Sequence, residues 1–139
     1  MKTRLLAKII AVLAIASPAL ADVNIVLNNG SIWQTGKGLD STEAFAQIHN
    51  EGSTADVLTG WSCSIAKTTT LLDAKGTALT SLPIPAKTTV TLSVNALHLQ
   101  LKTLNYPIVF GSVIPCAFTF QNAGSIGGYL NSVPPPASP

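Results

Sequence analysis

The feature that most constrains the fold is a succession of short β-type runs separated by turn residues at close intervals. The runs are rich in Val, Ile, Thr and aromatic residues, and no apolar stripe at helical spacing extends beyond two turns. About seven to nine short strands in roughly 110 residues are typical of an antiparallel sandwich or small barrel. Strands are predicted at 23–27, 44–49, 57–65, 68–72, 77–82, 88–94, 97–101, 114–121 and 126–131.

Turn-forming residues mark the connections between these runs. Asn, Gly and Lys-Gly clusters tolerate positive φ or make their own turns, and they occur at 28–30, 36–38, 50–52, 75–76 and 122–124. The proline-rich end, 132–139, cannot join a sheet and is predicted to be an extended tail. No internal repeat or linker interrupts residues 22–131, which are therefore predicted to form one domain.

The first 21 residues are typical of an export signal. Residues 1–8 carry three basic side chains, residues 9–16 are apolar, and Ala19-x-Ala21 matches the small-residue pattern of a signal-peptidase site. The apolar run is far shorter than the roughly 20 residues that span a bilayer, which disfavours a membrane anchor. We therefore expect a signal peptide at 1–21, cleavage after Ala21, and a bacterial periplasmic product with no transmembrane segment.

The basic net charge of the chain comes from this signal. The formal charge is +2 overall, whereas residues 22–139 hold five basic and six acidic side chains, which gives 5 − 6 = −1. Charged residues make up only 10% of the chain, against 47% hydrophobic residues, so neither disorder nor nucleic-acid binding is expected.

The two cysteines are predicted to form a disulfide. Alternation places Cys63 on one strand face with Val57, Thr59, Trp61 and Ile65, and places Cys116 with Phe118 and Phe120. Two inward cysteines in an oxidising compartment favour a bridge that pins the sandwich, closing a loop of about 54 residues. A thiolate metal ligand or redox thiol is the less favoured alternative, because the sequence has neither a CxxC motif nor a base beside either cysteine.

Catalysis finds no support in the sequence. The carboxylates fall mostly in or beside turns, without the spacing of a catalytic pair, and no Ser or Cys has an identifiable His base with an orienting carboxylate. Gly36-x-Gly38 opens no helix after a strand, so it indicates a turn and not a phosphate-binding loop. We do not expect an enzyme.

Several spaced stretches together resemble one known family. They are LPIPAKTTVTL at 82–92, LHLQL at 97–101 and VIPCAFTFQNAG at 113–124, preceded by IWQ at 32–34 and AFAQIHNEG at 44–52. Their order and spacing are similar to those of the periplasmic copper chaperones called PCu(A)C, over residues 32–124. The resemblance implies an all-β, cupredoxin-like, antiparallel Greek-key sandwich, in agreement with the strand pattern.

The family's copper ligands are mostly absent. The members of the family that this chain resembles typically hold Cu(I) with two histidines and two methionines. His98 falls on the second of these histidines. Gln100 stands where a methionine is expected, Leu72 aligns with the earlier histidine, and the other methionine falls near Ala78 or Thr80. Because the only methionine is Met1, a thioether copper site is excluded from residues 22–139.

Three residues remain as candidate metal ligands. His98 and Gln100 lie on the strand face opposite Leu97, Leu99 and Leu101 and should point away from the core. His98 would anchor an ion, Gln100 would offer an oxygen, and His49 is the only other imidazole. If the fold brought the histidines together, they would suit Cu(II) or Zn(II). The alternative is a solvated polar pair that binds no metal.

Two functions from different classes follow from this reading. The first is an exported, PCu(A)C-like copper-binding protein with an altered or lost metal site and a periplasmic or membrane cuproprotein as acceptor. The second is a structural or assembly subunit of the cell surface, of the fimbrial type, which would donate the strand at 23–27 to a neighbour. Such subunits lack a core strand when alone, whereas this chain has a full set, which favours the first function.

Overall fold

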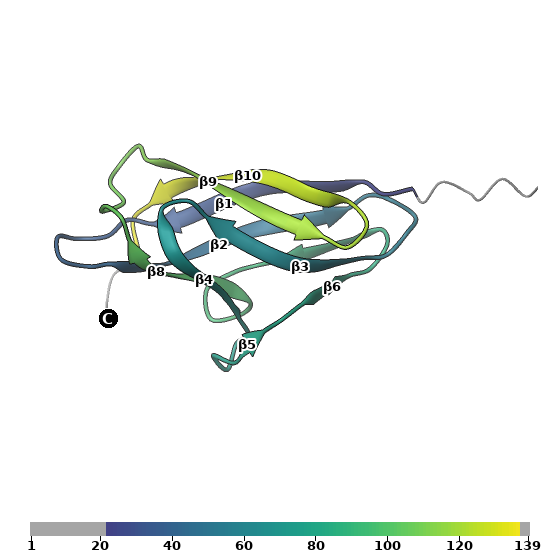
Figure 1. Ribbon diagram of the computed structural model, residues 1–139, viewed down its shortest axis with the longest axis horizontal. Coiled ribbons are helices and arrows are strands. Elements are labelled where there is room, and N and C mark those ends of the chain that lie inside the picture. The colour runs from purple at the N-terminus through teal and green to yellow at the C-terminus, as the bar shows by residue number, and fades with distance from the viewer. Residues whose placement is uncertain (1–21, 137–139) are drawn as a thin grey trace, which may run out of the picture.

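The structure is a computed structural model that describes residues 22–136, and it is all-β as predicted. No helix occurs among these residues (Figure 1). The strands are β1 (Ile25–Trp33), β2 (Ser41–Asn50), β3 (Asp56–Cys63), β4 (Ala66–Leu72), β5 (Ala78–Leu79), β6 (Leu82–Ile84), β7 (Thr88–Thr91), β8 (His98–Leu104), β9 (Val113–Phe120) and β10 (Gly124–Val133).

The strands form one continuous sheet that curls back on itself. Its order is β5-β4-β8-β2-β1-β10-β9-β3-β6, and β7 pairs with β2 beside this path. All pairs are antiparallel except β1–β10, which is parallel. β3 also packs against β4, so the two ends of the sheet approach each other and enclose the core in a flattened barrel (Figure 1). The cupredoxin-like Greek-key sandwich is therefore confirmed, with one parallel pair, β1–β10, in the middle of the sheet order.

Alternation along the strands separates the core from the outer face. In β2 the even-numbered side chains, such as Ala44 and Ile48, are fully buried, while Glu43, Gln47 and His49 are only half-buried on the outer face. In β8 the same period buries Leu99 and Leu101 and leaves His98 and Gln100 outside, as predicted. The largest fully buried side chains of the common core are Phe118, Phe120, Ile32, Ile48, Leu58, Ile65, Leu71, Ile84, Leu99, Leu101, Ile108 and Leu130.

The strand predicted at 77–82 is wrong, because the chain changes partner in the middle of it. Its first part is β5, which pairs with β4, and its end begins β6, which pairs with β3. These two strands lie at opposite ends of the sheet order. The chain crosses from β5 at one end of the sheet to β6 at the other, so pairing is interrupted at Thr80 and Ser81. Periodicity alone does not indicate such a change of partner strand.

The inward face predicted for β3 is also partly wrong. Its pairing with β9 shifts register between Leu58 and Gly60, so that a bulge interrupts the alternation. Leu58 is fully buried and Thr59 is exposed, the reverse of the prediction, while Cys63 beyond the bulge is buried as expected.

The predicted turn at 28–30 is a bulge inside β1. The pairing of β1 with β2 shifts register between Asn28 and Ser31, and Asn29 has a positive φ of 52°. A Cβ at Gly30 would collide with the backbone carbonyl of Tyr129 and lie 2.9 Å from the Leu130 side chain. Gly30 is therefore required because it lets β10 approach β1 where their parallel pairing begins.

This close approach predicts a large effect of a single added methyl group. Gly30→Ala should lower the free energy of unfolding by about 2–3 kcal/mol, because the rigid backbone of β10 must move. Gly36→Ala is the matched control, since its Cβ would meet only the Leu39 side chain at 3.9 Å. Urea unfolding of both variants measures the difference, and equal midpoints would show that β10 can shift without cost.

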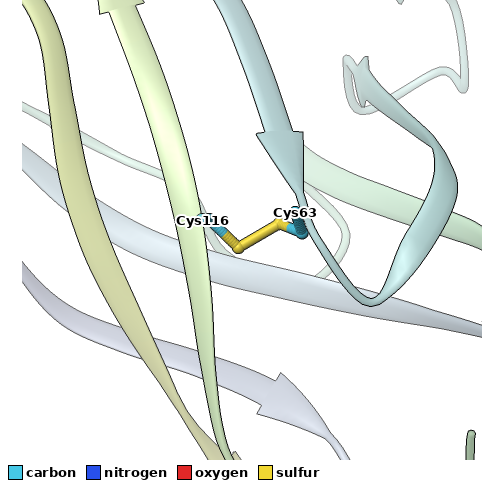
Figure 2. The surroundings of a disulfide bond; sticks show 2 residues. All are labelled: Cys63 and Cys116. Atoms are coloured by element: carbon cyan, nitrogen blue, oxygen red, sulfur yellow. A yellow bond between two sulfur atoms is a disulfide. The ribbon is translucent and has the colours of Figure 1, made fainter.

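The predicted disulfide joins two neighbouring strands. Cys63 at the end of β3 and Cys116 in β9 are directly paired, and their sulfur atoms are bonded across a sequence separation of 53 residues (Figure 2). Both side chains are buried. Because both cysteines of the chain are in this bridge, neither is a free thiol that could act as a metal ligand or redox group.

A signal peptide and a tail were predicted at the two ends of the sequence. The expected signal peptide, 1–21, lies outside the described residues, as do residues 137–139 of the expected tail. Ser132 and Val133, which the prediction placed in the tail, belong to β10, and residues 134–136 follow it without regular structure. Within the described part of the chain, no helix is long and apolar enough to cross a membrane.

Candidate metal site

His98 begins β8 and is held in one orientation by its own turn. Its Nδ1 atom lies 2.8 Å from the carbonyl oxygen of Ala96, to which it donates a hydrogen bond. That contact assigns the proton of the neutral ring to Nδ1 and leaves the lone pair on Nε2. The side chain is 13% exposed, so the ring is largely covered by its neighbours and restricted in motion. His98 therefore presents a positioned nitrogen donor at the outer face.

Glu43 is the nearest charged partner of this nitrogen. Its Oε1 atom lies 3.7 Å from Nε2 of His98, and its side chain is 31% exposed. Glu43 comes from β2 and His98 from β8, two strands that are hydrogen-bonded to each other. Among the described residues, no Lys or Arg lies within ion-pair distance of Glu43, so its carboxylate is not neutralised by a permanent cation.

Gln100 lies beside this pair, because it is the register partner of Glu43 across the β2–β8 ladder. Directly opposed side chains in an antiparallel pair have Cβ atoms about 5 Å apart. Glu43 and Gln100 both line a hollow of about 280 Å³, together with Trp33 and Pro135. The hollow gives solvent and small ligands access to the carboxylate and the amide.

An aromatic pair forms the wall next to these polar groups. The Trp33 and Phe45 rings are tilted by 60° with centroids 5.2 Å apart, which keeps Phe45 buried although it lies on the outer face of β2. Pro135 and Pro136 flank Trp33, since Pro135 lines the hollow with Glu43 and Pro136 lines a second hollow with Phe45. The segment after β10 thus covers part of the face that carries the candidate site.

His49 lies elsewhere on the same face. Continuing the β2–β8 register past Ala44 and Leu99 places His98 opposite Phe45, four residues or about 13 Å from His49 along β2. Both ring nitrogens of His49 are already engaged, at 2.8 Å from Thr89 Oγ1 and 2.7 Å from Asn28 Oδ1. The structure does not bring the two histidines together, so they have no geometry for sharing an ion.

Glu43 is the residue that the sequence interpretation missed. The predicted strand started at Ala44, which left Glu43 outside it, whereas β2 begins at Ser41. Within β2, Glu43, Gln47 and His49 alternate with the inward side chains, and this alternation was the available signal. Its closeness to His98 depends on the β2–β8 register, which no pattern within either segment specifies.

The donor set of this site differs from that of a thioether copper site. Within residues 22–136, no three His, Cys, Asp or Glu side chains gather at one point. These residues contain no methionine, and the two cysteines are bonded to each other. The site therefore offers one imidazole, one carboxylate and one amide, and no sulfur donor.

Comparisons with known proteins agree with this architecture. Residues 16–128 match the family described as "Putative lipoprotein LpqE-like". No curated protein matches the chain in sequence. The match to the LpqE-like family covers most of the chain and includes every strand up to the first part of β10.

Solved structures of copper-related domains share the fold. The apo PCuAC domain from PmoF1 superposes with a TM-score of 0.74 at 20% identity, covering 82% of this chain and 98% of that one. The copper-bound PCuAC domain from PmoF2 gives 0.73 at 16% identity, with coverages of 83% and 97%. The solution structure of Cu(I)-DR1885 from Deinococcus radiodurans gives 0.66 at 18% identity, with 84% and 82% covered. The chain belongs to the LpqE-like family, and its domain has the PCu(A)C fold.

Proposed function

We propose that this chain is an exported, copper-chaperone-like binding protein that has lost the methionine–histidine site for Cu(I) and retains a site anchored by His98. The observation that carries the proposal is the free Nε2 of His98, which the Nδ1 contact to Ala96 orients toward the outer face beside Glu43. An imidazole whose second nitrogen is held by a backbone carbonyl has the usual arrangement of a metal-binding histidine. Gln100 contributes an amide oxygen, and the role is binding, without catalysis.

Export and a protein acceptor complete the proposal. The signal-like residues 1–21 and the buried disulfide both suit an oxidising compartment, and we place the protein in the bacterial periplasm. Two of the structural relatives are described as copper-bound, which supports copper as the cargo. The acceptor would be a periplasmic or membrane cuproprotein, because a carrier needs a partner that takes its ion.

The structure does not favour the alternative role as a strand-donating surface subunit. The segment at 23–27 that would be donated lies largely within β1, where Ile25, Val26 and Leu27 pair with β2 of the same chain. A strand engaged in its own sheet is not available to complete that of a neighbour.

A single substitution tests the anchor. His98→Ala should weaken copper binding by on the order of 100-fold or more, because losing a group that merely orients a ligand already costs 10–100-fold. The measurement is titration of the purified protein with Cu(I) under anaerobic conditions and with Cu(II) in air, against a competing chelator.

His49→Ala is the control, since the engaged ring of His49 lies about 13 Å from the anchor along β2. It should bind copper like the unmodified protein, and circular dichroism should show all three proteins to be equally folded. If the His98→Ala variant binds both ions as tightly as the unmodified protein, His98 is not the anchor. If the unmodified protein binds neither ion, only the scaffold has been retained.

A further inference from the structure

We infer that His98 and Glu43 form a site for a borderline divalent cation, Cu(II) or Zn(II), and that this site discriminates against Cu(I). The inference rests on the proposed function, because it assigns the cargo of the same His98 site. Glu43 becomes a ligand, although it is not among the three candidate ligands predicted from the sequence.

The separation of the two donor atoms, which is within ion-pair distance, is also close to that of two ligands of one ion. At 3.7 Å, His98 Nε2 and Glu43 Oε1 are too far apart for a hydrogen bond. Two ligands of one tetrahedral ion, with metal–nitrogen and metal–oxygen bonds near 2.1 Å, stand about 3.4 Å apart. An approach of a few tenths of an ångström would therefore allow both atoms to bind one ion.

The strand pairing fixes these donors to rigid elements. Glu43 is paired across the ladder with Gln100, and His98 is two residues from Gln100 on the same face of β8. The core side chains Ala44 and Leu99 lie directly behind them and are fully buried. Ligands carried by packed strands lose little freedom on binding an ion, which favours affinity.

The chemistry of the donors sets the preference among ions. Cu(I) is soft and is selected by thiolate and thioether ligands, whereas imidazole and carboxylate suit Zn(II) and Cu(II). The local donors are an imidazole, a carboxylate and an amide, and the sulfur atoms of Cys63 and Cys116 are bonded to each other in another part of the sheet. A divalent ion also gains more than Cu(I) from the negative charge of Glu43.

The small number of protein ligands leaves coordination positions open. Since no third His, Cys, Asp or Glu joins the pair within the described residues, water and the Gln100 oxygen would fill the rest of the shell. Glu43 and Gln100 line the hollow beside Trp33, so these positions are reached from solvent. Open positions are where an acceptor's ligand would enter to remove the ion.

Calorimetric titration with Zn(II), Cu(II) and Cu(I) tests this assignment on the unmodified protein and on three variants. Glu43→Gln keeps the shape of the side chain and removes its charge, and it should weaken Zn(II) and Cu(II) binding by at least about tenfold. Glu51→Gln is the matched control, because Glu51 is exposed and contacts Asn24 away from the site. Glu51→Gln should change nothing, and His98→Ala should weaken binding of both divalent ions by on the order of 100-fold or more.

The outcomes separate this inference from the proposed function. If His98→Ala weakens binding to this extent while Glu43→Gln binds divalent ions like the unmodified protein, the inference is wrong and the His98 anchor stands. Tighter binding of Cu(I) than of Cu(II) by the unmodified protein also overturns it. If no ion binds at all, both proposals fail together.

Discussion

Replacing both Cys63 and Cys116 with alanine is expected to lower the free energy of unfolding by about 4 kcal/mol. The bridge joins two residues with a sequence separation of 53, and chain-entropy estimates for a loop of that size give about 4 kcal/mol. β3 and β9 are already hydrogen-bonded neighbours where the bridge lies, so the bond adds little order to the folded state (Figure 2). Its effect should come mainly from the unfolded chain, which is more expanded without it.

Denaturant unfolding of the oxidised protein, the reduced protein and the double variant measures this effect. The double variant should unfold at a lower urea concentration and with a larger m-value, since more surface is exposed in the unlinked chain. The reduced protein should resemble it, because no other cysteine is present. A loss below about 1 kcal/mol would contradict an entropic role for the bridge. Metal binding at His98 should be unchanged, since β2 and β8 do not carry the cysteines.

The all-β fold could be predicted because its signals are local. Short β-type runs, turn residues and alternation are properties of contiguous segments, and they located the core residues Leu99, Leu101 and Phe118 correctly. The disulfide followed from the same alternation together with the expected compartment. The resemblance to PCu(A)C proteins added the cupredoxin-like, Greek-key type of sandwich, which periodicity alone cannot supply.

Most of the errors arise where two distant segments meet. The bulge that reverses Leu58 and Thr59 is produced by pairing with β9, and the bulge at Gly30 accommodates β10. Glu43 and His98 are 55 positions apart, and only the β2–β8 register places their donor atoms 3.7 Å from each other. A candidate site on this fold therefore depends on register, which a single sequence specifies only indirectly.

The removal of the buried Asp56 carboxylate should destabilise the protein by about 3–5 kcal/mol. Asp56 begins β3 and is only 2% exposed. Its Oδ1 atom accepts hydrogen bonds from the backbone N–H groups of Val57 at 2.7 Å and Asn122 at 2.9 Å, and its Oδ2 accepts one from Ala123 at 2.9 Å. Asp56→Ala leaves these donors without their partner, and each buried unsatisfied group costs about 1–3 kcal/mol.

The position of these donors explains why the effect should extend beyond a single contact. β9 and β10 are joined by a short turn (Figure 1). Asn122 and Ala123 lie in this turn, so the carboxylate ties the hairpin to the start of β3. Asp56→Asn can retain the two bonds of Oδ1, but its amide nitrogen would face the N–H of Ala123. The Asp56→Asn variant should therefore lose less stability, about 1–3 kcal/mol, because only one buried donor is left unsatisfied.

Asp73→Ala provides the matched control. Asp73 Oδ1 also accepts from two backbone N–H groups, those of Lys75 and Thr77, both at 2.9 Å, but these bonds lie at the exposed turn before β5. Asp73 is half-buried, and water reaches its turn and can replace the carboxylate, so this variant should lose no more than about 1 kcal/mol. Urea unfolding of the three variants should rank their losses as Asp56→Ala, Asp56→Asn and Asp73→Ala, from largest to smallest. Equal losses of stability for Asp56→Ala and Asp73→Ala would show that burial does not increase the contribution of the Asp56 carboxylate, which holds the β9–β10 hairpin, to stability.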